Sequence, residues 1–280
     1  TLPRCGAGSA TTPGPLARMR LPVSSSPVLW LLRLGGFVFA ALCFSACEEE
    51  IELPDATGGR GTITVVDSSE GEGKTGWWPS LAFSNDDIPH LSYCDAHRGN
   101  LMHATRKDGQ WRTEVVEHRG AVGKYTSLAV NSKGEPAISF YDQGHKYLRY
   151  AWRENGTWNS ERVACGLEIG MGSELVFDER DTAHLFYYVP SGRLVHNQRT
   201  GPGEWDAQTV DDAVGGFSAK ISVVPRKEGF WVSYVNWGFK DTALMLARPK
   251  PNGGYSVEKI AEKHGPGWRS VLYFDKSDPT

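Results

Sequence analysis

The chain has 280 residues, enough for one large domain or two small ones. It is rich in Gly (32), Trp (10), Tyr (10) and Phe (11), and its only long apolar run lies near the N-terminus, so we expect an all-β, turn-rich body. The formal net charge is −3; residues 1–46 hold four arginines and no acid, which leaves 26 basic and 33 acidic residues for the remainder. The absence of any Lys/Arg cluster argues against a nucleic-acid partner.

The N-terminal segment has the features of an export signal. The first methionine is Met19, so residues 1–18 are interpreted as upstream translation or a truncated start, and residues 19–46 as a signal peptide. Its apolar run, Leu34 to Ala46, is shorter than the roughly 18–20 residues that cross a bilayer. Extending the run towards Pro27 would enclose Arg33, at a cost of about 3 kcal/mol. A cleaved signal is therefore predicted rather than a membrane-spanning helix.

The signal ends at a possible lipidation site. Phe44-Ser45-Ala46-Cys47 resembles the lipobox of bacterial lipoproteins, and this resemblance implies a lipidated Cys47 that anchors the chain to a membrane. The alternative is ordinary cleavage near Ala46 without a lipid. The residue after Cys47 is Glu rather than Asp, which in that family points to the outer membrane. Residues 47–61 are acidic, then Gly-rich, and are predicted to form a flexible tether.

Residues 62–280 are built from repeats. Leu81, Leu128, Leu175 and Ile221 begin equivalent short strands at spacings of 47, 47 and 46 residues. We place full repeats at about 76–116, 123–163, 170–210 and 216–260, with a partial copy at 265–280. Residues 62–66 resemble the last strand of a repeat and precede the first full copy.

Each repeat contains four short apolar runs separated by turn sequences. In the first copy the runs are 80–84, 89–95, 101–106 and 111–116, and Asp108-Gly109 joins the last two as a hairpin. Four strands in a repeat of 40–50 residues indicate a β-propeller with four-stranded antiparallel blades. A sandwich would not repeat its Trp and Gly positions, and the rungs of a β-helix are shorter. One such sheet cannot bury both faces alone, so neighbouring blades are expected to cover each other.

The repeats also resemble a known group. Units of the form S-L-A … P-H-I-S-Y-x-D … L-x-Y-A … G-x-W are similar to secreted bacterial β-propeller repeats of the sialidase-like (BNR-type) group. The resemblance covers about 62–280 and implies the fold more specifically than an activity. The Ser-x-Asp-x-Gly-x-x-Trp box of true sialidases is not met, because Asp108, Gly109 and Trp111 have a different spacing.

The two ends of the repeat region carry orphan strands. Four full blades with a strand at 62–66 and another at 265–280 suggest part of a longer ring, of about five to seven blades. In the alternative, a small ring, the two orphan strands share one incomplete blade.

One face of the propeller gathers the candidate binding residues. The fourth-to-first and second-to-third connections share this face, because strands alternate in direction within a blade. Aromatic rings beside polar groups suit sugars, whereas in the simpler interpretation the rings only fill the central channel. Asp95 and Asp142 fall at equivalent positions, which favours a turn-stabilising role. The ligand-face candidates outside the inner-strand interior are Trp77, Trp78, Asp95, Arg98, Tyr125, Asp142, Asn236, Trp237, Trp268 and Arg269.

Two charged residues interrupt the repeat. The position held by Ser80, Ser127 and Ser270 is aligned with Glu174 and Lys220 in the third and fourth copies. Charges near a propeller axis must be paired or wetted. The two residues therefore either pair across the channel or serve a ligand, and Glu174 with Tyr125 is the weak candidate for catalysis.

No cofactor or metal is expected, since the repeated histidines lack metal-ligand spacing. The predicted function is a surface-anchored lipoprotein of the cell envelope whose propeller binds glycan or protein. The alternative is a sialidase-like glycoside hydrolase.

Overall fold

The computed structural model describes residues 51–54, 60–68, 75–118, 120–166, 168–214, 220–237, 242–262 and 270–273. The predicted signal peptide, Cys47, Trp268 and Arg269 lie outside these residues. The chain divides into two units, Thr1–Thr64 and Val65–Thr280. Within the described part of the chain, no helix is long and apolar enough to cross a membrane.

The described part of the first unit is a two-stranded hairpin. β1 (Ile51–Pro54) pairs antiparallel with β2 (Arg60–Ile63), with Ile51 opposite Ile63. This differs from the sequence prediction of a tether over 47–61 and a strand over 62–66. Pairing two runs so close in sequence closes only a short loop, at low entropic cost.

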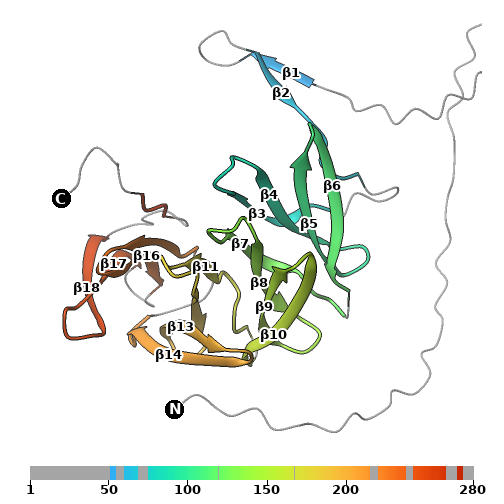
Figure 1. The fold of residues 1–280 in the computed structure, drawn as a ribbon. Coiled ribbons are helices and arrows are strands. Elements are labelled where there is room, and N and C mark those ends of the chain that lie inside the picture. Colours follow the sequence, from blue (N-terminus) through green and yellow to red (C-terminus); the bar gives the residue numbers. More distant parts are fainter. Residues whose placement is uncertain are drawn as a thin grey trace, which may run out of the picture. The chain divides into compact units, whose positions relative to one another are not determined.

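The second unit is a β-propeller in which every blade is a four-stranded antiparallel meander. Neighbouring strands in the chain are neighbours in the sheet, and the blades follow one another from teal to red in Figure 1. Blade 1 comprises β3 (Trp77–Phe83), β4 (Pro89–Asp95), β5 (Asn100–Lys107) and β6 (Gln110–Glu117), and blade 2 comprises β7 (Lys124–Val130), β8 (Pro136–Asp142), β9 (Tyr147–Glu154) and β10 (Thr157–Cys165). Blade 3 comprises β11 (Glu174–Phe177), β12 (Ala183–Val189), β13 (Arg193–Gly201) and β14 (Glu204–Asp211), and blade 4 comprises β15 (Ser222–Arg226), β16 (Gly229–Trp237), β17 (Thr242–Pro249) and β18 (Tyr255–Glu262). The predicted fold class is confirmed.

Local turn chemistry fixes the hairpins between third and fourth strands. Asp108 and Gly109 have φ values of 55° and 78°, and Asn155 and Gly156 have 50° and 79°. Two successive residues with positive φ make a type I′ turn, whose twist matches that of the strands it joins. Asp, Asn and Gly tolerate this conformation, so the sequence dictates where these strands reverse.

The blades bury one another, as predicted. Leu148 of blade 2 packs in one cluster with Leu175 and Leu185 of blade 3, and Phe186 of blade 3 packs with Val232 and Tyr234 of blade 4. Full burial of each such side chain contributes roughly 1.5–3 kcal/mol. The core therefore consists of layers between sheets rather than a single central mass.

A serine hydroxyl links each of three inner strands to the chain segment that begins after its blade. Ser80 Oγ accepts from the Leu128 amide at 3.0 Å, Ser127 Oγ from the Leu175 amide at 3.0 Å, and Ser222 Oγ from the Leu272 amide at 2.9 Å. Each of these serines also pairs in register with a serine of its second strand, Ser92, Ser139 and Ser233 respectively. We call these contacts the serine links.

The serine links correct two alignments. In blade 4 the linking position belongs to Ser222 rather than Lys220, so Lys220 and Ile221 were aligned two residues early. A shift of two residues keeps side chains on the same face of a strand, so the apolar pattern could not reveal it. Ser270 was aligned one residue early: it lies 3.0 Å from Ser233, as Ser173 does from Ser139.

Candidate functional site

The inner strands of blades 1 and 2 begin with a β-bulge. Trp77 pairs with Cys94 and Ser80 with Ser92, so Trp78 and Pro79 stand opposite a single residue; Lys124 to Ser127 repeat this arrangement. Bulges of this kind re-aim a side chain at the end of a strand. Here they direct residues at the face formed by the fourth-to-first and second-to-third connections.

Each bulge places a large aromatic residue in the left-handed backbone region. Trp78 has a φ of 51° and Tyr125 a φ of 54°, and Gly172 holds the same position in blade 3 with a φ of 77°. This conformation costs a non-glycine residue on the order of 1–3 kcal/mol, and strain of this kind gathers at binding sites. Glycine would adopt the conformation freely, yet two blades use rings.

The bulges bring four side chains together, which we call the aromatic cluster: Trp77, Trp78, Lys124 and Tyr125. The centroids of the Trp78 and Tyr125 rings are 5.2 Å apart, and those of Trp77 and Trp78 are 5.3 Å apart. Lys124 Nζ lies 5.2 Å from the centre of the Trp78 ring, a cation–π distance. Trp77 keeps half of its surface exposed. The exposed rings can stack on the apolar face of a ligand, and the ammonium group of Lys124 can bond to polar groups at the edge of that ligand.

A hydrogen-bond chain fixes the backbone beneath the cluster. Thr126 Oγ1 donates to the carbonyl of Trp78 at 2.7 Å, and Ser92 Oγ donates to Thr126 Oγ1 at 2.9 Å. These bonds join blade 1 to blade 2 at the strained positions. The rings are therefore presented by a rigid support rather than by a free loop.

Asp95 and Asp142 hold the second-to-third loops, as the sequence analysis favoured. Asp95 Oδ1 accepts from the amides of His97 and Arg98, at 3.0 and 3.1 Å, and Oδ2 accepts from Arg98 Nη1. Burial alone would raise the pKa of Asp95, but the bonds from Arg98 and His97 hold this pKa below its usual value. Asp142 is fully buried and accepts from the amide of His145. Both carboxylates are committed to their loops.

Glu174 occupies the serine position of blade 3. Ser127 Oγ donates to Glu174 Oε2 at 3.3 Å across the boundary between blades 2 and 3. Burial raises the pKa of Glu174 to about 7, against the opposing effects of the Lys220 charge and the Ser127 bond. Among the described residues no ion pair joins Glu174 to Lys220. This carboxyl can hold or release a proton near neutral pH.

The structure distributes the other ligand-face candidates more widely. Arg98 is exposed at its loop, and Asn236 Nδ2 donates to the carbonyl of Ala213 at 3.0 Å. Trp237 ends β16, and its side chain is not among those described. Arg193, at the start of β13, donates from Nε to Ser191 Oγ. The structure thus brings together Trp77, Trp78 and Tyr125, and leaves Arg98 within its own loop.

The repeated histidines pair inside blades. His90 Nδ1 lies 3.0 Å from His103 Nε2, and His184 Nδ1 lies 2.8 Å from His196 Nε2. Over the described residues, no group of three His, Cys, Asp or Glu side chains could hold a metal ion.

Sequence reasoning did not predict the strained backbone or the place of Lys124 over the Trp78 ring. One signal was present: the glycine at position 172 aligns with Trp78 and Tyr125 once the bulges are counted. A glycine that alternates with aromatic residues at one repeat position indicates a backbone with positive φ.

Comparison with known proteins establishes the fold alone. No family model matches the sequence, and no curated protein does. A protein of unknown function from Dyadobacter fermentans matches with a TM-score of 0.52 and 13% identity, over 67% of this chain and 70% of that one. An Aleuria aurantia lectin variant in complex with Fucα1-6GlcNAc matches with a TM-score of 0.51 and 12% identity, over 75% and 71%.

An α-L-arabinanase from Penicillium chrysogenum, complexed with arabinobiose, matches with a TM-score of 0.50 and 12% identity, over 67% of each chain. The chain spans less than two thirds of several other propeller structures that it matches. At these identities the similarity supports a β-propeller and no particular activity.

Proposed function

We propose that the chain is a carbohydrate-binding β-propeller and that its site is the face that carries the aromatic cluster. The observation that carries the proposal is the pair Trp78 and Tyr125, held 5.2 Å apart by two strained bulges. The apolar C–H face of a sugar ring stacks on such rings, while its hydroxyls bond to polar groups at the rim. Lys124 supplies a hydrogen-bond donor beside the rings.

The fold similarity supports this proposal indirectly. The lectin and the arabinanase that share the fold were both determined with sugars bound, so propellers of this shape can carry such sites. A protein ligand is the competing occupant of the same face.

A glycan array followed by titration calorimetry tests the proposal. We expect a sugar to bind the wild-type chain, and Trp78→Ala and Tyr125→Ala each to weaken binding at least tenfold, about 1.4 kcal/mol. Phe83→Ala is the matched control, since Phe83 is an exposed ring at the opposite end of the same strand. An array without any ligand above background, or equal loss in the control, would refute the proposal.

Glycoside hydrolysis is the second candidate, and Glu174 is the residue that favours it. A carboxyl with a pKa near 7 is suited to donate a proton to a leaving oxygen at neutral pH. Fluorogenic sialosides and arabinosides are the probes. Turnover by the wild-type chain that is abolished in Glu174→Gln, with sugar binding retained, would establish this alternative over simple binding.

We further propose that the chain is exported and held in the cell envelope through a lipid on Cys47. The proposal rests on the lipobox-like residues and the short apolar run before them. Metabolic labelling with a radioactive fatty acid should mark the wild-type chain and leave Cys47→Ala unlabelled. Equal labelling of both would exclude this anchor.

A further inference from the structure

A groove opens at the other end of the blades, far along the strands from the aromatic cluster. The turns between first and second strands are joined in blades 1 to 3: Asn85 Nδ2 donates to the carbonyl of Ser132, and the amide of Ser132 donates to Asp181 Oδ1 at 2.8 Å. Between blades 3 and 4 the corresponding turns border a groove of about 1070 Å³. That volume is slightly above the range of about 300–1,000 Å³ that is usual for small-ligand sites.

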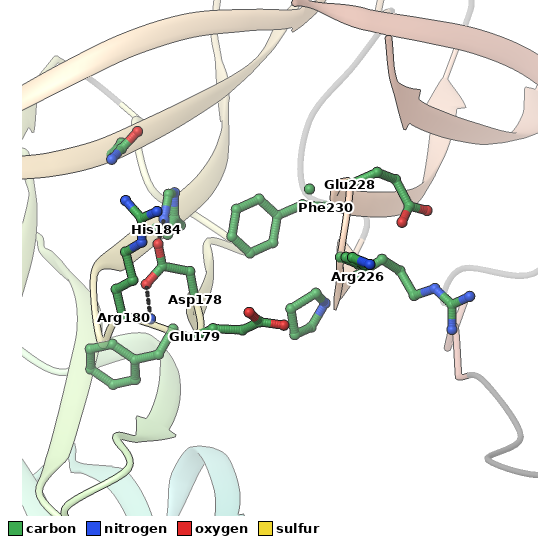
Figure 2. Close-up of a pocket in the computed structure, with 12 residues that line it drawn as sticks. Asp178, Glu179, Arg180, His184, Arg226, Glu228 and Phe230 are labelled. Atoms are coloured by element: carbon green, nitrogen blue, oxygen red, sulfur yellow. Dashed lines mark hydrogen bonds and ion pairs between the residues drawn. The ribbon is translucent and has the colours of Figure 1, made fainter. Parts of the chain in front are cut away.

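One side of the groove is formed by the turn between β11 and β12, which the Asp178 carboxylate stabilises. Its Oδ1 accepts from the amides of Arg180 and Thr182, at 2.9 and 2.7 Å. These bonds commit Oδ1 to the turn. Its Oδ2 lies 3.5 Å from His184 Nε2, so this oxygen faces the groove beside the imidazole (Figure 2).

His184 has a ring nitrogen with no hydrogen-bond partner. The side chain is only 5% exposed, and Nδ1 is engaged by His196, whose other nitrogen lies 3.1 Å from the Tyr255 hydroxyl. Among the described groups, Nε2 has no hydrogen-bond partner, because the contact with Asp178 is too long for a sound bond. A buried polar nitrogen without a partner is costly, whether it carries the proton or a lone pair, so such a group in a native fold calls for a ligand or a solvent molecule.

The remaining walls set the kind of ligand. The centroid of the Phe230 ring is 4.4 Å from that of the His184 ring. In Figure 2 the Phe230 ring lies between His184 on one side of the groove and Glu228 on the other. The lining holds three acidic and three basic side chains, so neither a polyanion nor a polycation gains a net attraction. Gln198 also lines the groove.

We propose that this groove is a second binding site, separate from the aromatic cluster, for a neutral polyhydroxylated ligand such as the end of an oligosaccharide. A single hydroxyl can accept from His184 Nε2 and donate to Asp178 Oδ2, which completes both groups at once. The walls of the groove leave room for more than one sugar ring. The chain would then hold carbohydrate at both ends of its strands.

Saturation-transfer NMR and calorimetry test the site with methyl α-L-fucoside, arabinobiose, cellotriose and maltotriose, and with glucuronate as a charged probe. Gln198→Trp fills the groove from an exposed position. Asp178→Asn keeps the oxygen that holds the turn and replaces the one that faces His184. We expect each variant to weaken binding of a neutral probe at least tenfold. Gln110→Trp, on an exposed hairpin of blade 1, is the matched control and should bind like the wild type.

Trp78→Ala separates this site from the one on the opposite face. In this variant the groove should still bind, and only the second equivalent of ligand should be lost. Addition of the probe should also shift the Nε2 resonance of His184. The inference is overturned if no neutral probe binds saturably, if both groove variants bind like the wild type, or if only glucuronate responds to them. Circular dichroism and the unfolding midpoint confirm that each variant is folded.

Discussion

Trp78 and Tyr125 lie side by side, with ring centroids 5.2 Å apart, because they hold the same left-handed position at the start of adjacent inner strands. The distance in sequence is one whole repeat. Both residues are strained, because a residue with a β-carbon disfavours this left-handed backbone conformation. The strain is tolerated because the Thr126 bond and the bulge pairing over-determine the geometry.

This strain predicts that the usual order of stability of a glycine and an alanine variant is reversed at Tyr125. Tyr125→Gly should unfold at a higher urea concentration than Tyr125→Ala, by about 1 kcal/mol in free energy, because only glycine accepts a φ of 54° without cost. At an ordinary strand position alanine would be the more stable of the two. Leu128, in the same strand with ordinary geometry, serves as the comparison site. Equal stability of the two Tyr125 variants would mean that the backbone there is not strained.

The serine links predict a stability loss out of proportion to the atoms removed. Ser127→Ala deletes one oxygen and leaves the Leu175 amide without its partner, which should cost about 1–2 kcal/mol. The apparent free energy of unfolding in urea measures this change. Ser256→Ala, on an exposed position of β18, should change it by less than about 0.5 kcal/mol. If Ser127→Ala lowers the free energy of unfolding no more than Ser256→Ala does, the serine links do not stabilise the contact between blades.

The buried histidines predict acid sensitivity. Burial lowers the pKa of His90 to about 4 and that of His196 to about 3, whereas the unfolded side chains titrate near 6.5. Below pH 6.5 the unfolded chain therefore binds more protons than the folded chain. The free energy of unfolding then decreases as the pH is lowered, by up to about 1.4 kcal/mol per pH unit for each histidine. The loss runs from pH 6.5 down to about 4. Urea unfolding at pH 7, 6 and 5 should show it, and His90→Gln should reduce the slope.

Glu174 predicts the opposite dependence on pH. Its folded pKa, raised by burial to about 7, exceeds the unfolded value near 4.3, so the folded state holds a proton that the unfolded state releases. The charged form destabilises the fold above about pH 7, and this penalty disappears as pH falls towards 4.3. Glu174→Gln should thus stabilise the chain by up to about 3 kcal/mol at pH 8, since each pKa unit corresponds to about 1.4 kcal/mol, and by much less at pH 5. A variant that is destabilised at both pH values would point to a favourable role for the carboxylate.

The sequence predicted the blades well because strand boundaries depend on local chemistry. Asp108-Gly109 and Asn155-Gly156 mark reversals that any strand pair would need there, and the apolar runs between such turns became the strands. The position of Ser222 was missed for a physical reason: a two-residue shift preserves the alternation of faces on which the alignment depended. The bond to Leu272 and the pairing of Ser222 with Ser233 distinguish the two alignments.

The candidate sites were less predictable, since both arise where blades meet. Trp77, Trp78 and Tyr125 were chosen by residue type, but the backbone that aims them follows from pairing with the second strands. The groove depends on the separation between two turns, and His184 was set aside as a repeated position. Its unpaired nitrogen is visible only once Asp178 and His196 are placed around it.

The serine links all run in one direction: the hydroxyl belongs to the earlier blade and the amide to the chain segment that follows that blade. During synthesis blades 1, 2 and 4 therefore already present a hydroxyl acceptor when the chain segment that follows each of them leaves the ribosome. Growth of the sheet array can proceed by docking each new strand onto a finished template, from the N-terminal blade onwards. Ser80 is in place before Leu128 has been made, so translation order and docking order coincide.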